Sequence, residues 1–173
     1  MIVLETERLR LRWLTLDDAP FIIELVNDPS FIRFIGDKGV RTIADAEKYI
    51  LNGPVASYEQ YGYGLYATEL KDDSVPIGIC GILKRETLPH PDIGFAFLPA
   101  YWKQGYAFEA AAGVMKYARN ALNVDTILAI TTPENEASGK LLRKIGLSFE
   151  RLIRLTSESD EVKLFTTSRN GDR

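Results

Sequence analysis

The sequence predicts a mixed α/β fold in which one central sheet, mostly antiparallel, is flanked by helices. Three apolar segments separated by short polar turns fill residues 64–98, and such a run predicts antiparallel strands. After residue 105 the hydrophobic period changes to 3.6, and helices then alternate with apolar, β-branched segments. Alternation of this kind implies some parallel pairing, so both kinds of pairing are expected in one sheet.

The first half of the chain predicts one strand and two helices. Leu9, Leu11 and Trp13 alternate with arginines, which is the pattern of a half-buried strand. Apolar residues at helical spacing follow up to Asp28-Pro29, which is expected to end the first helix. A second helix is expected to begin after Thr42, and its end, near residues 52–54 or beyond, stays open.

The remaining elements follow in order along the chain. Strands are predicted over residues 64–70, 75–85 and 92–98, a helix over 106–122, a strand over 126–131 and a helix over 134–144. Gly146 stands where a left-handed residue closes that helix, and two strands, about 147–155 and 162–167, complete the chain. The predicted order is βααβββαβαββ, within a single domain spanning residues 1–173.

Composition excludes several classes of protein. The chain has 173 residues, 46% of them apolar and 26% charged, as expected of a soluble globular domain. A net charge of −3 argues against partners such as nucleic acid or an anionic membrane, and no signal peptide or membrane span is expected. Cys80 and His90 are the only residues of their kinds, so neither an intrachain disulfide nor a Cys/His zinc site is expected. A reducing, cytoplasmic location is the simplest interpretation.

The segment Pro99–Glu109 joins a strand to a helix, with Gly105 at the start of the helix. The first turn of a helix offers unpaired N–H groups and a partial positive charge, and glycine lets a ligand approach the backbone closely. The segment therefore predicts a phosphate site, with a plain strand-to-helix turn as the alternative. Neither a Walker loop nor a three-glycine Rossmann loop is present.

Two polar residues continue an apolar helix face. Leu141, Leu142 and Ile145 form the inward stripe of the helix over 134–144, and Ser138 and Asn135 extend it toward the N-terminus. Asn135 suits an N-cap. Ser138 is expected either to bond back to a carbonyl or to meet a polar ligand. Two strands also carry faces of small residues, Gly94 with Ala96 and Gly78 with Cys80, which favour close approach of a ligand or of a closely packed helix.

Three motifs resemble those of a known family. The first is Leu98-Pro99-x-Tyr101-Trp102-x-x-Gly105-Tyr106-Ala107-x-Glu109-Ala110, the second comprises Asn135, Ser138, Lys144, Gly146 and Leu147, and the third is the opening Thr6-Glu7-Arg8-Leu9-x-Leu11-Arg12. Together they resemble the GNAT N-acetyltransferase superfamily, and more narrowly its Rim-type branch of ribosomal-protein-alanine N-acetyltransferases. The likeness spans nearly the whole chain and implies the acyl-CoA N-acyltransferase fold.

The resemblance implies acetyl-CoA as co-substrate and no metal. Backbone groups around Phe97 and Leu98 would pair with pantetheine, Asn135 would touch its side, and Ser138 would lie near the sulfur. N–H groups of the loop would hold the pyrophosphate, and the residues concerned are Lys103, Gln104, Gly105, Tyr106, Ala107 and Phe108. Phe108 departs from the branch, which usually has Thr or Ser there. Leu142 occupies the place of the tyrosine acid found in many members, so Ser138 is the candidate for protonating the thiolate.

The resemblance also implies direct attack of an amine on the thioester in a ternary complex, with a backbone N–H near Leu98 as the oxyanion donor. Asp92 and Glu69 are candidate bases, with solvated strand-end charges as the alternative, and His90 is expected to be a loop residue. The acceptor site is placed at Phe31, Arg33 and Phe34. The tyrosines of residues 58–66 (Tyr58, Tyr61, Tyr63 and Tyr66) crowd its approach and suit either a cleft or packing.

The absence of an obvious strong base favours an amine that is partly neutral near pH 7.5, such as a peptide or protein N-terminus. A small-molecule amine and a catalytically silent acyl-CoA-binding module are the alternatives. The chain is expected to be a monomer or a homodimer.

Overall fold

The computed structural model describes residues 1–167, and in that part of the chain eight strands form one sheet. They are β1 (Ile2–Glu5), β2 (Leu9–Arg12), β3 (Leu65–Leu70), β4 (Pro76–Leu83), β5 (Asp92–Phe97), β6 (Leu128–Thr131), β7 (Leu147–Arg154) and β8 (Glu161–Thr167). Their order in the sheet is β1-β2-β3-β4-β5-β6-β8-β7. Only β5 and β6 pair in parallel among these strands, so the expectation of a mixed, mostly antiparallel sheet is confirmed.

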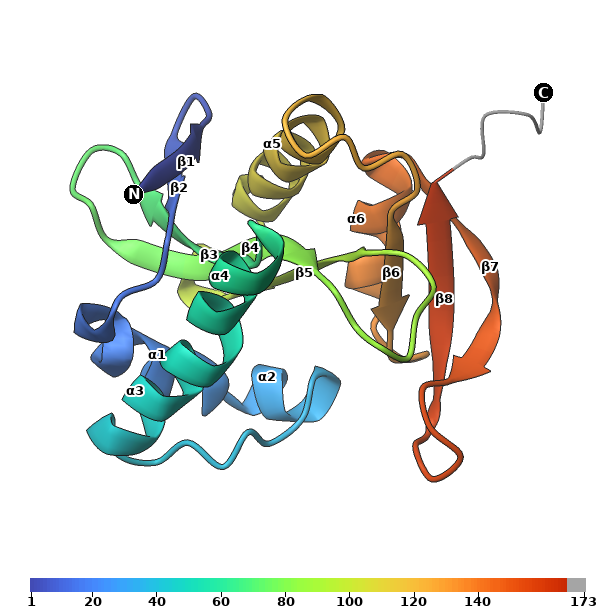
Figure 1. The fold of residues 1–173 in the computed structure, drawn as a ribbon, viewed down its shortest axis with the longest axis horizontal. Helices are drawn as coiled ribbons and strands as arrows, with labels where there is room; N and C mark the ends of the chain where they lie inside the picture. The colour runs from blue at the N-terminus through green and yellow to red at the C-terminus, as the bar shows by residue number, and fades with distance from the viewer. Residues whose placement is uncertain (168–173) are drawn as a thin grey trace.

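Helices cover both faces of the sheet (Figure 1). The helices are α1 (Ala19–Val26), α2 (Pro29–Phe34), α3 (Ile43–Ile50), α4 (Ala56–Tyr61), α5 (Tyr106–Asn120) and α6 (Glu136–Lys144). Helices α1, α2 and α3 lie on one face, where they pack on Ala67, Ile79 and Ala96. On the other face, α5 and α6 pack on residues that include Cys80, Phe97 and Phe165. No helix within residues 1–167 is both long and apolar enough to cross a membrane.

The structure contains more elements than the sequence predicts. Strand β1 pairs antiparallel with β2 at the sheet edge and was not expected. Pro29 does end α1, but it also opens α2, where the Asp28 carboxylate caps the Ser30 N–H at 2.9 Å. Proline is well suited to a first turn because its missing N–H has no helical partner there. After α3 the chain continues through a π-helical segment, Leu51–Val55, into α4.

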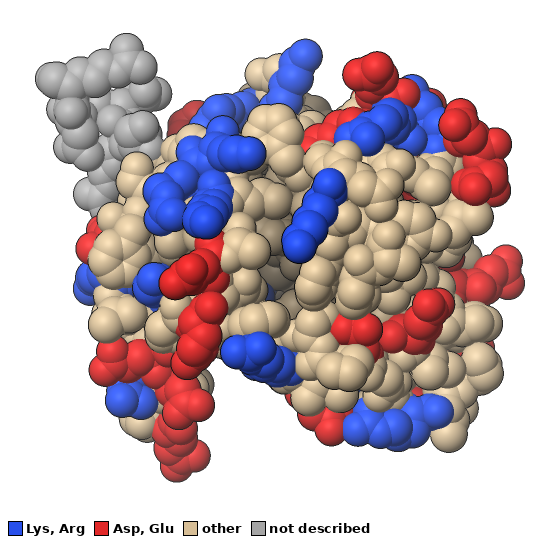
Figure 2. All heavy atoms as spheres, turned by 180° about the vertical axis from the view of Figure 1, so that it is seen from behind, with Lys and Arg blue, Asp and Glu red and all other residues tan. Residues whose placement is uncertain are grey.

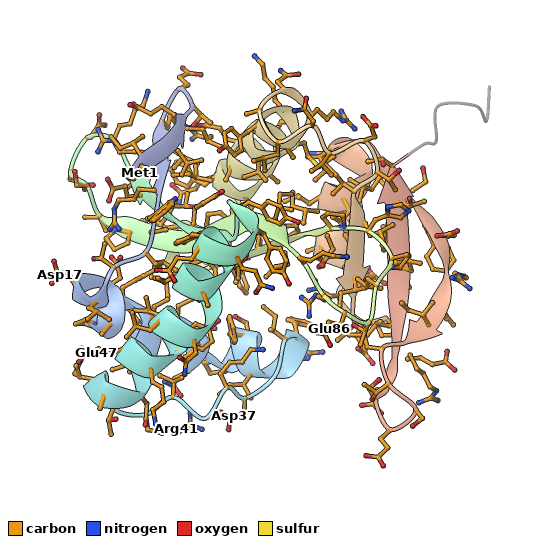
Figure 3. The ribbon with its side chains drawn as sticks, viewed as in Figure 1. Met1, Asp17, Asp37, Arg41, Glu47 and Glu86 are labelled. Atoms are coloured by element: carbon orange, nitrogen blue, oxygen red, sulfur yellow. The ribbon has the colours of Figure 1, made fainter. Side chains whose placement is uncertain are left out.

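Cap residues fix the boundaries that the sequence did indicate. Thr42 accepts a hydrogen bond from the Asp45 N–H at 3.1 Å and forms a capping box with Asp45, so α3 begins where expected. Gly146 has a φ of +101° just after α6, in the left-handed region that glycine tolerates best. Side chains fill the space between the layers, while labelled charged residues such as Asp17 and Glu47 point outward (Figure 3).

Helix α5 is held tightly against the sheet. Its inward residues Ala110, Ala111, Val114 and Ala118 are all 0% exposed, and three of the four are alanines. Small side chains allow the helix axis to lie close to the strands, so its first turn is firmly positioned beside the end of β5. The faces of small residues on β4 and β5 are filled by protein. A Cβ on Gly78 would lie 2.5 Å from the Phe97 ring, and one on Gly94 would lie 2.9 Å from Leu83.

Candidate active site

The β5–β6 ladder stops almost where it begins. Asp92 and Leu128 form its single register pair, and the Leu128 N–H donates to the Pro91 carbonyl oxygen at 2.9 Å. Beyond that pair the two strands have no further pairing, and they diverge in Figure 1. Backbone groups on the facing edges therefore lack strand partners, and such groups require another partner if they are shielded from water.

The direction of each N–H on β5 determines which groups face the opened ladder. The Leu98 N–H donates to the Ile77 carbonyl oxygen at 2.9 Å, so it points to β4 and is already satisfied. The oxyanion donor expected near Leu98 is therefore not the Leu98 N–H itself. Successive residues of a strand direct their N–H groups to opposite edges, so Phe95 and Phe97 face β6. The Phe97 carbonyl oxygen accepts from Trp102 Nε1 at 2.8 Å, which leaves the N–H groups of Phe95 and Phe97 as the candidate donors.

Two hydroxyl groups stand unpaired at the end of β6. Thr131 Oγ1 and Thr132 Oγ1 are buried and have no hydrogen-bond partner within the described residues. An unsatisfied buried polar group costs about 1–3 kcal/mol, so these hydroxyls fit a site whose ligand carries polar groups. The sequence analysis missed both residues. The sequence feature that could have revealed them is a pair of polar residues at the carboxyl end of a parallel strand, where ligands of α/β folds commonly bind.

Helix α6 begins at the same end of β6. Asn135 Oδ1 accepts from the Ser138 N–H at 3.2 Å, which confirms the expected N-cap. The Ser138 side chain is half-buried, and among residues 1–167 its hydroxyl makes no hydrogen bond, so the bond back to a carbonyl is not formed. The next inward residue, Leu142, is 1% exposed and contributes no polar group.

The loop before α5 presents free backbone donors. Lys103 and Gly105 have φ values of +62° and +82°, and Gly105 is the N-cap residue without any side-chain cap. Lys103, Gln104 and Phe108 are exposed, whereas Tyr106 and Ala107 are half-buried. The first-turn N–H groups of a helix carry a partial positive charge, so this 15-residue helix offers an anion site at its exposed start.

Arg8 fastens this loop to the β1–β2 turn. Its guanidinium donates to Glu109 Oε1 at 2.8 Å and to the Gln104 carbonyl oxygen at 3.0 Å, and it lies 4.2 Å from the centre of the Tyr106 ring. Burial alone would raise the pKa of Glu109, but hydrogen bonds from Thr6 and Arg8 outweigh it and hold that pKa below its usual value. The ion pair fixes the first turn of α5. Contacts between residues about 100 positions apart leave no periodic signal in a sequence.

Asp92 lies where β5 and β6 part. Its side chain is 1% exposed, and Arg85 Nε donates to both of its carboxylate oxygens, at 3.1 and 3.2 Å. Burial raises the pKa of Asp92 to about 6, although Arg85 opposes the shift. A carboxylate with a pKa near neutrality is suited to exchanging protons at physiological pH.

The other candidate base is excluded by its surroundings. Glu69 is 5% exposed and pairs with Arg10 at 3.0 Å and Arg12 at 2.9 Å, so its carboxylate is fully engaged. It lies on β3, which β4 separates from β5, so neither expected alternative, a base or a solvated strand-end charge, describes it. Arg12 also binds Asp18 at 2.8 Å, which makes this a structural ion network. His90 lies in the loop before β5, as expected.

The residues expected at the acceptor site are only partly available. Phe31 is 5% exposed and packs in the core beneath α1–α3, whereas Arg33 is exposed and covers the Phe34 ring at 4.8 Å. Tyr58 and Tyr66 are core residues that stack with ring centres 5.5 Å apart, so for them the packing interpretation holds. Tyr61 and Tyr63 stack nearer the surface, at 5.9 Å.

Comparison with known proteins identifies relatives along most of the chain. Residues 8–148 match the acetyltransferase (GNAT) domain. The uncharacterized N-acetyltransferase YoaA of Bacillus subtilis (strain 168) is 29% identical over 154 residues, covering 88% of this chain and 86% of its own.

Two solved structures share the fold. An acetyltransferase from Agrobacterium tumefaciens has a TM-score of 0.81 at 24% identity, over 96% of this chain and 94% of its own. RimL, a ribosomal L7/L12 alpha-N-protein acetyltransferase in complex with coenzyme A, has a TM-score of 0.79 at 16% identity, over 99% of this chain and 100% of its own.

Proposed function

The chain belongs to the acetyltransferase (GNAT) family and is an acetyl-CoA-dependent acetyltransferase, and we propose that its acceptor is the α-amine of a peptide or protein N-terminus. The observation that carries this proposal is Asp92, a buried carboxylate at the point where β5 and β6 part, with a pKa raised to about 6. We further propose that residues 1–173 form one such domain.

The residues at the opened ladder fit coenzyme A. We propose that the exposed backbone N–H groups of residues 103–108 hold the pyrophosphate, since the α5 start lacks a side-chain cap. The unpaired Thr131 and Thr132 hydroxyls, the Asn135 amide and the β6-facing backbone of Phe95 suit the amide-rich pantetheine arm. Acetyl-CoA supplies a thioester, whose carbonyl carbon is the electrophile. Phe108 offers an aromatic surface, with Lys144 Nζ 5.9 Å from its ring, in place of the hydroxyl usual in the Rim-type branch.

Three groups of this chain then have separate tasks. The Phe95 or Phe97 N–H donates to the oxygen that gains negative charge. Asp92 takes a proton from the acceptor ammonium, through a water because its carboxylate is almost fully buried. The Ser138 hydroxyl, which has no partner within residues 1–167, donates to the sulfur as it leaves. Holding both reactants in place contributes about 7–11 kcal/mol in favourable cases, so these groups need supply only the remainder.

A single buried carboxylate suits an α-amine better than a lysine. An α-amine with a pKa of about 7.7–8.0 is roughly one-third neutral at pH 7.5, whereas a lysine side chain is only about 0.1% neutral. Asp92 acts from a pKa of about 6, below that of either amine, so it removes a proton more readily from the weaker base. RimL, which shares the fold, is named as an alpha-N-protein acetyltransferase.

The proposal is tested with short peptides that each contain one lysine and have either a free or a blocked N-terminus. We expect acetyl transfer to the free N-terminus, located by tandem mass spectrometry, and transfer to blocked peptides at least tenfold slower, because lysine is rarely neutral. Label on lysine in a peptide whose N-terminus stays free would overturn the α-amine proposal. Transfer to small amines but to neither peptide would instead indicate a small-molecule acceptor.

Ser138→Ala is expected to lower turnover by about 10- to 100-fold while changing the affinity for acetyl-CoA by less than threefold. The hydroxyl gains strength as a donor only when charge develops on sulfur, so its loss affects the rate more than binding. Steady-state kinetics at saturating peptide and a CoA titration measure the two effects. Ser148→Ala, at an exposed position on β7, is the matched control. Unchanged turnover in the Ser138 variant would show that Ser138 only supports the start of the helix.

The burial of Asp92 also favours a second candidate function, an acyl-CoA-binding module without catalysis. If no solvent path reached the carboxylate, the chain would bind coenzyme A yet transfer nothing. Thiol release from acetyl-CoA, measured with a panel of peptides and small amines, separates the two. Release that rises with amine concentration supports the enzyme, and CoA binding without release supports the module.

A further inference from the structure

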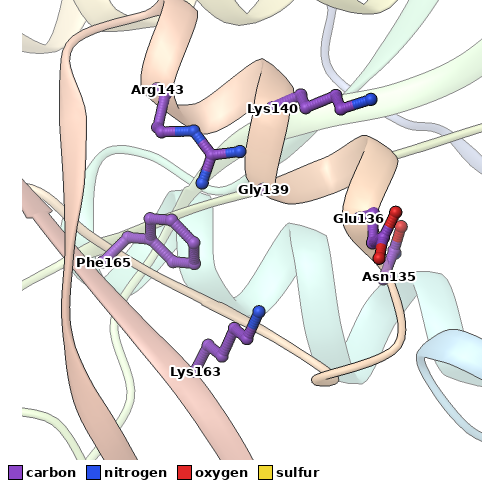
Figure 4. Close-up of a pocket in the computed structure, with 7 residues that line it drawn as sticks. All are labelled: Asn135, Glu136, Gly139, Lys140, Arg143, Lys163 and Phe165. Atoms are coloured by element: carbon purple, nitrogen blue, oxygen red, sulfur yellow. The ribbon is translucent and has the colours of Figure 1, made fainter.

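A pocket lies between α6 and β8. The cavity has a volume of about 280 Å³ and is lined by Asn135, Glu136, Gly139, Lys140, Arg143, Lys163 and Phe165. Its walls are therefore α6 and β8. In Figure 4 the side chains of Arg143 and Lys163 extend from the two elements toward the space between them, and the Phe165 ring lies beside Arg143.

This pocket shares only Asn135 with the coenzyme A site proposed above. None of residues 103–108 and no residue of β5 lines it. At about 100° of helix rotation per residue, Arg143 lies roughly 140° around the helix from Ser138. On the α5 side of the helix, Lys144 contacts the Phe108 ring, whereas on the pocket side Gly139 packs toward Phe165 of β8. The same helix thus serves two different surfaces.

The pocket is strongly positive in an acidic protein. Lys140, Arg143 and Lys163 line it against one carboxylate, Glu136, which gives three positive charges minus one, or +2, in a chain of net charge −3. Within residues 1–167, none of the three cations forms an ion pair. Figure 2 shows Lys and Arg side chains together in the upper left part of the back face, with Asp and Glu side chains below them. Like charges repel when brought together, so this arrangement favours an anion between them.

Gly139 keeps the pocket open without serving the packing of the fold. A glycine inside a helix is less stable than alanine. A Cβ at this position would lie 3.5 Å from Phe165 Cζ and 3.9 Å from Arg143 Nη1, both ordinary contacts. The backbone φ is not in the left-handed region either, so alanine would fit. The glycine therefore makes the helix less stable than alanine would, and it leaves the space between α6 and β8 unfilled.

We propose that the pocket between α6 and β8 binds a phosphate-bearing anion, with Arg143 and Lys163 as its principal ligands. A phosphate dianion matches the pocket charge of +2, and the guanidinium fork of Arg143 suits two phosphate oxygens. The pocket is larger than a phosphate ion, which leaves room beside Phe165 for an organic group on the anion. This chemistry belongs both to a free phosphomonoester and to the 3′-phosphate of coenzyme A reaching around the helix.

The test is a phosphate titration of the ¹⁵N-labelled full chain at constant ionic strength. We expect saturable amide shifts at residues 135–143 and 163–165, which are scored apart from any shifts at the pyrophosphate site of residues 103–108. Arg143→Gln and Lys163→Gln should each weaken binding by about tenfold, because each removes a charge-assisted hydrogen bond. Lys116→Gln, on the exposed side of α5, removes the same charge elsewhere and should leave the affinity unchanged.

Gly139→Ala should weaken binding while raising the melting temperature by about 2–4 °C, so its effect cannot come from unfolding.

Competition identifies the source of the phosphate. Saturating dephospho-CoA should leave the phosphate affinity unchanged, since it lacks the 3′-phosphate. Displacement by CoA but not by dephospho-CoA supports the site with the 3′-phosphate as its ligand, and displacement by neither supports it with a free phosphomonoester. Absence of saturable shifts, equal affinity in all variants, or displacement by dephospho-CoA would overturn the proposal.

Discussion

Replacing Asp92 with Asn is expected to lower turnover at pH 7.5 by about 100-fold or more, the usual contribution of a general base. Asn preserves the size of the side chain but cannot accept the proton. Asp92 lies where the β5–β6 ladder ends and has a pKa raised to about 6 by burial. Steady-state kinetics with a free N-terminal peptide measure the effect, and CoA affinity should change by less than threefold.

The pH dependence of the rate distinguishes a base from a structural residue. Turnover of the wild-type enzyme should fall about tenfold per pH unit below about pH 6, where Asp92 becomes protonated. This fall is the acidic limb of the pH–rate profile. The Asp92→Asn variant should lack the acidic limb, and its turnover should follow only the ionisation of the amine. Arg85 holds the pKa of Asp92 down, so Arg85→Gln should move the limb to higher pH. A limb that stays in place in both variants would contradict a role for Asp92 as the base.

Stability supplies an independent control. The pKa of Asp92 is raised from 3.8 to about 6 on folding, so the folded protein binds more protons between those values. The contribution of this group to the free energy of unfolding is therefore present below pH 3.8 and lost as the pH rises through about 6. The Asn side chain stays neutral at every pH, so the variant does not lose this contribution as the pH rises. The Arg85 side chain is 38% exposed, so water can hydrate its guanidinium in place of the lost carboxylate. The urea midpoint of Asp92→Asn at pH 7.5 should be no lower than that of the wild type, and a large drop would mean that lost activity reflects unfolding.

Local signals predicted the elements on which the candidate site depends. Gly105 marked the start of α5 because a left-handed residue at a helix start favours glycine. Asn135 marked the start of α6 because its amide caps the first turn. Changes of hydrophobic period located the sheet and the two helices behind it. Each of these signals is carried by residues within one turn or one strand, so no tertiary contact is needed to recognise it.

Three errors at the candidate site involve partners distant in sequence. The direction of the Leu98 N–H depends on the register between β4 and β5, where a shift of one residue would turn it to the other edge. Glu69 has a carboxylate, as a candidate base must. Arg10 and Arg12, about 60 positions earlier in the chain, form ion pairs with that carboxylate and so compensate its charge. Thr131 and Thr132 matter because the ladder opens beside them, which only the sheet order reveals.

Gly105→Val is expected to remove most of the stabilisation that coenzyme A confers. In the wild type, ligand at about 100 times its dissociation constant stabilises the fold by about 2.7 kcal/mol, which is roughly a 5–10 °C rise in melting temperature. Gly105 has a φ of +82°, and a Cβ there would lie 3.3 Å from Arg8 Nη2. Valine strains that backbone, displaces the Arg8 contact and covers the N–H groups at the start of α5. Differential scanning fluorimetry with and without CoA measures the shift.

Gly62→Val separates loss of the ligand site from backbone strain. Gly62 follows α4 with a φ of +81°, nearly that of Gly105, and a Cβ there meets nothing within 4 Å. Both variants therefore carry a similar conformational penalty, and both should melt below the wild type without ligand. Only Gly62→Val should keep the full CoA-dependent rise, because its turn lies apart from the α5 loop. A full rise in Gly105→Val, or no rise in a folded wild type at millimolar CoA, would show that the start of α5 does not hold the pyrophosphate.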